Sequence, residues 1–195
     1  MHHIYETEAF VLRNTPQAEA DAFITLFTRD LGLIRATAQG IRYEKSKLRF
    51  AMQNFSYAHV SLVRGKGMWR LTNSTPLENF SANISETSLC VMARIFKLLE
   101  RLLAGESGDE KLFSILYSGI KFLEKNQNEE KEKIADIEAV IVLRILNRLG
   151  YVGQSEKINF FVLNDEWEGE VFEQMKKERR EALRAINSGL RESQL

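Results

Sequence analysis

The stretch from residue 21 to residue 72 most constrains the fold, because apolar runs of strand length alternate there with glycine-containing turns. Turn signals stand at 30–32 and 64–67, where glycine can supply the positive φ that a tight hairpin requires. Residues 29–70 hold nine lysines and arginines against two acids, and most of these cations fall in the connections between the runs. The pattern predicts a small, basic β-domain.

The first 75 residues or so contain five such runs, rich in β-branched and aromatic side chains. Pro16 and Pro76 are expected to end the first and last strands, and residues 41–53 to form a basic loop with one helical turn. Five short strands fit a small barrel of the OB or SH3-like kind, and the strand count agrees with an OB-fold. The expected strands are Tyr5–Arg13, Ala22–Arg29, Leu33–Gly40, Phe55–Val63 and Met68–Thr72.

From residue 81 the apolar period changes from two to 3.6, which predicts helices. We expect helices over about 85–104, then from a capping box at Ser107 and Glu110, then from Ile134 to a stop at Gly150, and last over about 171–192. Apolar residues at 158–163 and 170–172 suggest a small hairpin. The predicted class is α+β: an N-terminal OB-fold five-stranded barrel at 1–79, followed by an α-helical bundle-like domain at 80–195.

Charge divides the chain in the same way. Residues 1–76 carry four more positive than negative charges and the remainder four more negative, although the total is zero.

The single cysteine, Cys90, excludes a disulfide framework and is expected to pack as a small apolar residue. No secretion signal or membrane-spanning run is recognisable, so we expect a cytoplasmic protein with no membrane partner.

No pattern indicates catalysis, and we expect no enzyme, no catalytic residue, no cofactor and no metal. His59 lies within a predicted strand without a companion nucleophile, and no phosphate-binding glycine motif is present. Glu166, Glu168 and Glu170 are the only candidate metal or acid–base cluster, and they are more simply a solvated acidic loop.

The basic β-domain instead has the composition of a single-stranded nucleic-acid binder, which combines cations for the phosphates with aromatic faces for the bases. Tyr43, flanked by charge, is the stacking candidate, whereas Phe50 and Trp69 are expected in the core. The predicted DNA-binding residues are Arg35, Arg42, Tyr43, Lys45, Lys47, Arg49, Arg64, Lys66 and Arg70.

The same residues resemble the RecO family of bacterial recombination-mediator DNA repair proteins. The similar pattern comprises Leu26-Phe27-Thr28, Gly32-Leu33, Ala38 and Gly40, Ser46-Lys47-Leu48, Gln53 and Phe55, and Gly65 with Trp69 and Leu71. A second match is the segment 143–151, LRILNRLGY, and a third is the C-terminal segment 190–195.

This resemblance implies an OB-fold and a helical domain that bind single- and double-stranded DNA and anneal complementary strands. It further implies partnership with RecR, contact with the C-terminal tail of the single-stranded-DNA-binding protein (SSB), indirect assistance to the RecA recombinase, and association with the nucleoid. Family members do this without nucleotide hydrolysis.

Two features depart from the family pattern. Many members carry a four-cysteine zinc module after the Leu-Gly-Tyr helix, whereas residues 158–172 contain no cysteine, and Gln39 stands where the family often has lysine.

The alternative function is that of an OB-fold module that binds RNA or only protein, without annealing activity. A metal-dependent nuclease using Glu166 and Glu168 comes third.

Overall fold

The computed structural model describes residues 3–17, 19–82, 84–153, 155–163, 167 and 169–193. It forms two compact units. The β-unit comprises Met1–Asn83 together with Leu103–Phe113, and the helical unit comprises Ile84–Leu102 together with Ser114–Leu195.

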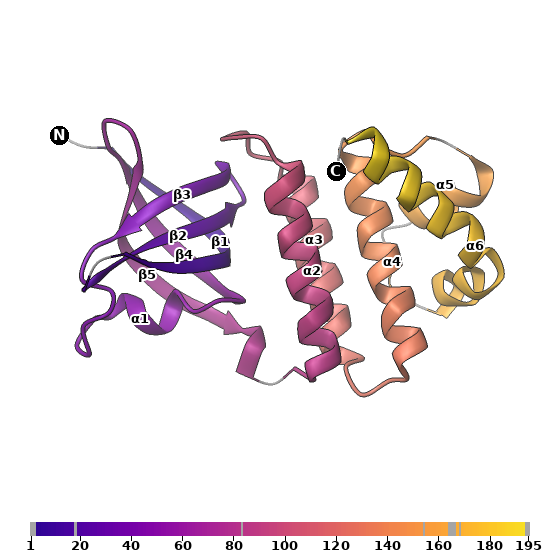
Figure 1. Ribbon diagram of the computed structural model, residues 1–195, viewed down its shortest axis with the longest axis horizontal. Helices are drawn as coiled ribbons and strands as arrows, with labels where there is room; N and C mark the ends of the chain where they lie inside the picture. Colours follow the sequence, from indigo (N-terminus) through magenta and orange to yellow (C-terminus); the bar gives the residue numbers. More distant parts are fainter. Residues whose placement is uncertain are drawn as a thin grey trace. The chain divides into compact units, whose positions relative to one another are not determined.

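The β-unit contains five strands: β1 (Ile4–Gln17), β2 (Asp21–Thr28), β3 (Gly32–Ala38), β4 (Ser56–Arg64) and β5 (Trp69–Asn79). They pair in the order β1-β2-β3-β5-β4, and β4 pairs back with β1, so every strand has two neighbours (Figure 1). All pairs are antiparallel except the short parallel contact between β3 and β5. With the helices that follow, this confirms the predicted α+β class.

Two prolines were expected to end strands, and both expectations are wrong. Pro16 pairs with Ala22 inside β1, and Pro76 pairs with Ala58 inside β5. Beyond Phe10, β1 is paired only with β2, and beyond Arg70, β5 is paired only with β4. Proline lacks an N–H donor, and each of these segments has an open side where that donor is not needed.

The interior of the strands follows the predicted period of two. In β2 and β3 every second residue is buried in one continuous cluster, including Ile24, Leu26, Ile34 and Ala36. Helix α1 (Leu48–Ala51) is the helical turn predicted within the basic loop, and Ala51 joins the same cluster. The basic connector is therefore anchored to the barrel by its own apolar residues.

A second apolar cluster in the β-unit is built around Phe113. Its ring centroid lies 5.3 Å from that of Phe10, 5.5 Å from that of Phe27 and 6.2 Å from that of Tyr57. Phe10, Phe27 and Phe113 are almost completely buried. Residues 103–113, distant in sequence from the strands, thereby become part of the β-unit.

The helical unit contains α2 (Glu86–Leu102), the larger part of α3 (Glu110–Lys125), α4 (Lys131–Arg148), α5 (Glu156–Leu163) and α6 (Gly169–Glu192). Gly150, with φ of +81°, follows α4 as predicted. No helix in the part of the chain that the structure describes is both long and apolar enough to cross a lipid bilayer.

Three sequence expectations for the helices are wrong. Helix α3 is capped by Asp109, whose carboxylate accepts from the Leu112 N–H at 3.0 Å, and not by Ser107. The predicted hairpin strand at 158–163 is helix α5, since Ile158 and Phe161, three positions apart, are its buried residues; four residues of the expected turn, 164–166 and 168, lie outside the described residues. Cys90 is exposed, because it lies beside the buried face of α2.

Candidate nucleic-acid interface

The basic connector between β3 and β4 is a series of tight turns. Backbone hydrogen bonds run from Tyr43 to Gly40 (3.2 Å), from Ser46 to Tyr43 (3.0 Å) and from Arg49 to Ser46 (3.3 Å). Ile41 and Met52, at its two ends, are buried. With both ends fixed in the core, the polar side chains between them face solvent, and Arg42, Lys45, Lys47 and Arg49 are all exposed.

Two aromatic rings accompany these cations on the same connector. Tyr43 is 66% exposed and Phe50 is 70% exposed. The prediction that Phe50 lies in the core is therefore wrong, because α1 turns Ala51 and Met52 inward in its place. Trp69 is 5% exposed and belongs to the barrel core, as predicted. The connector thus combines four cations with two exposed aromatic faces, the combination that single-stranded nucleic acid requires.

The connection between β4 and β5 carries the next predicted residues. Arg64, Lys66 and Arg70 are exposed, and Gly65 closes the turn with a 3.0 Å hydrogen bond from its N–H to the Met68 carbonyl. Arg64 differs from Lys66 and Arg70, because its charge is already paired with an acid. Its guanidinium pairs with Glu106 and lies 4.8 Å from the centroid of the Trp69 ring.

Strand pairing creates a further polar face that the sequence prediction missed. Arg13 pairs with Thr25, and Thr25 pairs with Arg35, which gives one row across β1, β2 and β3. The adjacent row runs through Thr15, Phe23, Thr37 and Arg70, which occupy β1, β2, β3 and β5. Residues paired in register project from the same side of a sheet, so Arg13 and Phe23 join the predicted Arg35 and Arg70 on one face.

The alternation of buried and outward residues in β2 was the signal that could have located Phe23. Arg13 could not be placed in the same way, because the register between β1 and β2 shifts between Val11 and Arg13.

Most of the predicted cations are free to meet a ligand. Among the residues that the structure describes, six of the nine predicted residues are cations that form no ion pair with a side chain: Arg35, Lys45, Lys47, Arg49, Lys66 and Arg70. In an OB-fold, the face of strands 2 and 3 and the loops between strands 1 and 2 and between strands 4 and 5 bind oligonucleotides. Arg35 and Lys66 lie on this surface, whereas Lys45, Lys47 and Arg49 lie on the connector between β3 and β4.

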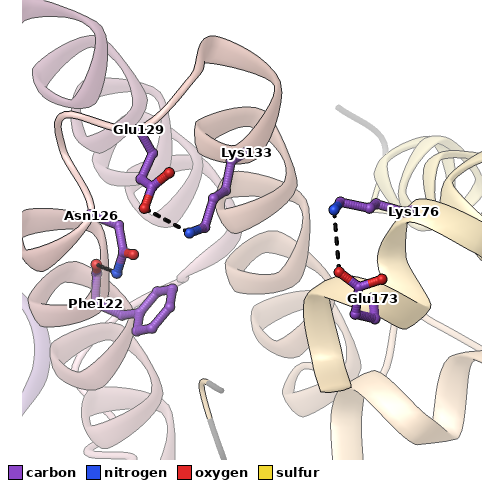
Figure 2. A network of polar contacts seen from close by, with 6 residues as sticks. All are labelled: Phe122, Asn126, Glu129, Lys133, Glu173 and Lys176. Carbon is purple, nitrogen blue, oxygen red and sulfur yellow. Dashed lines mark hydrogen bonds and ion pairs between the residues drawn. The ribbon is translucent and has the colours of Figure 1, made fainter. Parts of the chain in front are cut away.

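The helical unit has a hollow of about 890 Å³, which is lined by both acidic and basic side chains, unlike the basic connector of the β-unit. Its charged walls are self-compensated: Lys133 pairs with Glu129 at 2.8 Å, and Lys176 with Glu173 at 3.2 Å (Figure 2). Asp136 also lines it, and burial raises the pKa of this carboxyl although Arg179 opposes the shift. Apart from Lys125, the lysines and arginine of this hollow are already paired, so it is a poorer candidate for phosphate binding than the basic connector.

The candidate catalytic residues are not brought together. His59 pairs with Glu8 and Thr75 across the sheet and Cys90 is on a helix surface, while Glu166 and Glu168 lie outside the described residues. Within the described ranges, no three His, Cys, Asp or Glu side chains are grouped so that they could hold a metal ion.

Comparison with known proteins supports the resemblance noted in the sequence. Residues 1–80 match the family model described as "Recombination protein O N terminal", which is an OB-fold domain. A protein of Dehalococcoides mccartyi named DNA repair protein RecO is 34% identical over 129 residues, which cover 66% of this chain and 51% of the relative.

Proteins of the same name from Heliobacterium modesticaldum and Clostridium novyi are 31% and 28% identical, over 76% and 79% of this chain and 52% and 59% of their own length. The chain spans about half the length of the curated relatives it matches.

Proposed function

We propose that the chain acts in DNA repair and recombination by binding single- and double-stranded DNA through its β-unit, because residues 1–80 match the RecO N-terminal family model and the chain is similar to DNA repair proteins named RecO. One observation carries the proposal: exposed cations, of which Lys45, Lys47 and Arg49 form no ion pair among the described residues, lie with two exposed aromatic rings on the connector between β3 and β4. A protein with this role works at the nucleoid, in the cytoplasm.

Binding energy in this mechanism comes mainly from phosphate neutralisation. Lys45, Lys47 and Arg49 displace the counterions that surround the DNA backbone, which makes affinity fall steeply with salt. Tyr43 and Phe50 offer ring faces on which bases can stack, at about 1–3 kcal/mol per base. Both contributions are indifferent to sequence, as a protein that handles any damaged region needs.

Strand annealing follows from the same surface. Two complementary strands repel each other through their phosphates, and a surface that neutralises both lowers this repulsion while leaving the base edges free to pair. The connector and the face containing Arg35 and Arg70 supply cations from two parts of the β-unit. No nucleotide hydrolysis enters this mechanism.

The family resemblance implies three protein partners: RecR, the SSB tail and, indirectly, RecA. For the acidic SSB tail, the helical unit offers a groove of about 350 Å³ between α2, α4 and α6. Beside it lies a smaller hollow, of about 230 Å³, with Lys97 and Arg101 on its wall. The apolar residues that line the groove are Ile95, Leu98, Ala135, Ala139, Val142, Leu183, Ile186 and Leu190.

An apolar groove with a basic end suits a peptide that carries both acidic and apolar side chains. Leu183 lines the groove and is exposed, so Leu183→Asp should prevent docking of a synthetic SSB tail peptide without unfolding the unit. Leu163→Asp, at another exposed leucine of the same unit, is the matched control and should bind normally. Equal binding by both variants would place the peptide elsewhere.

The decisive test of the function is fluorescence anisotropy of a labelled, unstructured DNA oligonucleotide across a salt series, followed by a strand-annealing assay. We expect log affinity to fall linearly with log salt, by about 0.7 per phosphate contacted for single strands. Absence of DNA binding at low salt would refute the proposal. A preference for structured RNA, or binding to protein alone, would support the alternative OB-fold module, and DNA cleavage in magnesium or manganese would indicate a nuclease.

A further inference from the structure

The short segment between α2 and α3 is seated on the β2–β3 turn by direct backbone contact. A Cβ added to Gly32, whose φ is +70°, would lie 2.4 Å from the Ser107 carbonyl oxygen, and a Cβ added to Gly108 would lie 2.3 Å from the Asp30 carbonyl oxygen. Only glycine fits at either point, because any side chain would separate the two backbones. The position of Glu106, directly before Ser107, is therefore set by the β-unit.

Glu106 lines a groove of about 340 Å³ in the β-unit. The groove is lined by β3, the β4–β5 connection and residues 105–106, and includes Arg35, Met68 and Trp69. The Glu106 carboxylate accepts from the Arg64 guanidinium, which lies over the Trp69 ring. An acid on the groove wall thus neutralises Arg64, a predicted DNA-binding residue beside the groove, while Arg35 on the wall forms no ion pair among the described residues.

The indole of Trp69 connects Arg64 to this groove, because the ring lines the groove and the Arg64 guanidinium lies 4.8 Å from its centroid. Trp69 lines the groove and is almost fully buried, yet its Nε1–H has no hydrogen-bond acceptor among the described residues. Because that nitrogen is itself buried, a ligand in the groove would meet the Arg64 guanidinium and not the indole N–H.

We propose that the Arg64 guanidinium, beside this groove, is a phosphodiester-binding site that the carboxylate of Glu106 occupies in the free protein. The inference rests on the proposed DNA-binding function and adds to it one specific site and one competing residue. A carboxylate and a phosphodiester carry the same charge and both accept two hydrogen bonds from a guanidinium. DNA therefore displaces Glu106 from Arg64, and Glu106 weakens binding by competition.

The exposure of the pair sets how strongly Glu106 competes. The side chains of Arg64 and Glu106 are 50% and 41% exposed, so water screens their attraction. Exposed ion pairs of this kind change an equilibrium by about two- to fivefold. The ion pair therefore opens readily when a phosphate arrives, but breaking it lowers the affinity for DNA by a measurable factor.

The test is DNA affinity across a salt series for wild type, Glu106→Gln, Arg64→Met and the double variant. Glu106→Gln should bind single-stranded DNA about two- to fivefold more tightly at low salt, with a slope steeper by up to about 0.7, since Arg64 becomes free. Arg64→Met should cost more affinity in the Glu106→Gln background than in wild type. Glu110→Gln, which removes the same charge from an exposed site four residues further along the chain, is the matched control and should change neither quantity.

Each outcome decides the matter. If wild type binds DNA and Glu106→Gln is indistinguishable from it, the inference fails while the DNA-binding function stands. If Glu110→Gln strengthens binding as much as Glu106→Gln, the effect is one of overall charge and the site is refuted. If none of the four proteins binds DNA, the proposed function and the site fail together.

Discussion

The triple substitution of Lys45, Lys47 and Arg49 by alanine tests the proposed interface most directly. All three side chains are exposed, and within the described chain none forms an ion pair. The residues that anchor the connector, Ile41 and Met52, are untouched. Surface changes of this kind usually alter folding stability by less than about 0.5 kcal/mol each, so an effect on DNA binding would not come from unfolding.

The expected magnitude follows from the number of phosphates released. If each cation neutralises one phosphate of a single strand, the triple variant should reduce the slope of log affinity against log salt by about 2. When salt is raised from about 50 to 200 mM, both proteins lose affinity for DNA, and the factor lost by wild type should be about twenty times the factor lost by the variant. Fluorescence anisotropy with an unstructured oligonucleotide at several salt concentrations measures both slope and affinity.

A second triple variant supplies the control. Lys125, Lys131 and Lys177 are exposed lysines of the helical unit, and replacing them by alanine removes the same charge. This variant should keep the wild-type slope. The reasoning would be refuted if the connector variant kept the wild-type slope and affinity, or if the two triple variants weakened binding equally.

Three further predictions concern single residues. Phe50→Ala should weaken single-stranded DNA binding by about 1–3 kcal/mol through lost stacking, whereas Leu77→Ala, at another exposed apolar residue of the β-unit, should leave it unchanged in the same anisotropy assay. Phe113→Ala should lower the free energy of unfolding of the β-unit by about 3–5 kcal/mol in urea titrations, because a fully buried ring is removed; a loss below about 1 kcal/mol would contradict its place in the core. Asp136→Asn should raise the urea midpoint at neutral pH. Burial raises the folded-state pKa of Asp136, so the folded state binds its proton more tightly than the unfolded state, and wild-type stability falls as pH rises from the ordinary aspartate pKa through the folded-state pKa. An unchanged difference between variant and wild type across that pH range would contradict this sign.

The sequence prediction was accurate wherever one local pattern determined the structure. The alternation in β2 and β3 placed Ile24, Leu26 and Ile34 inside, and the glycines at 32 and 150 do have the positive φ expected of them. It failed where two local rules competed. The apolar run at 158–163 fits either a strand or a short helix, and both Ser107 and Asp109 are good caps before α3.

The prolines failed for a different reason. Proline breaks a ladder only where both sides of a strand need donors, and whether Pro16 and Pro76 lie in such a place depends on which strands flank them. Strand order is a property of the assembled sheet. Phe50 is a similar case, since its exposure depends on which side of the α1 turn faces the barrel.

By itself, the sequence determined the fold class, the number of strands, the position of the charge surplus and the family resemblance, because each depends on composition or on periodicity within a short window. Only the tertiary structure decided that Arg13 and Phe23 share a face with Arg35 and Arg70, and that Glu106 pairs with Arg64. These groupings join residues as many as 57 positions apart along the chain. Local patterns carry no information about such distances, which are set by strand register and by the seating of residues 103–113 on the barrel.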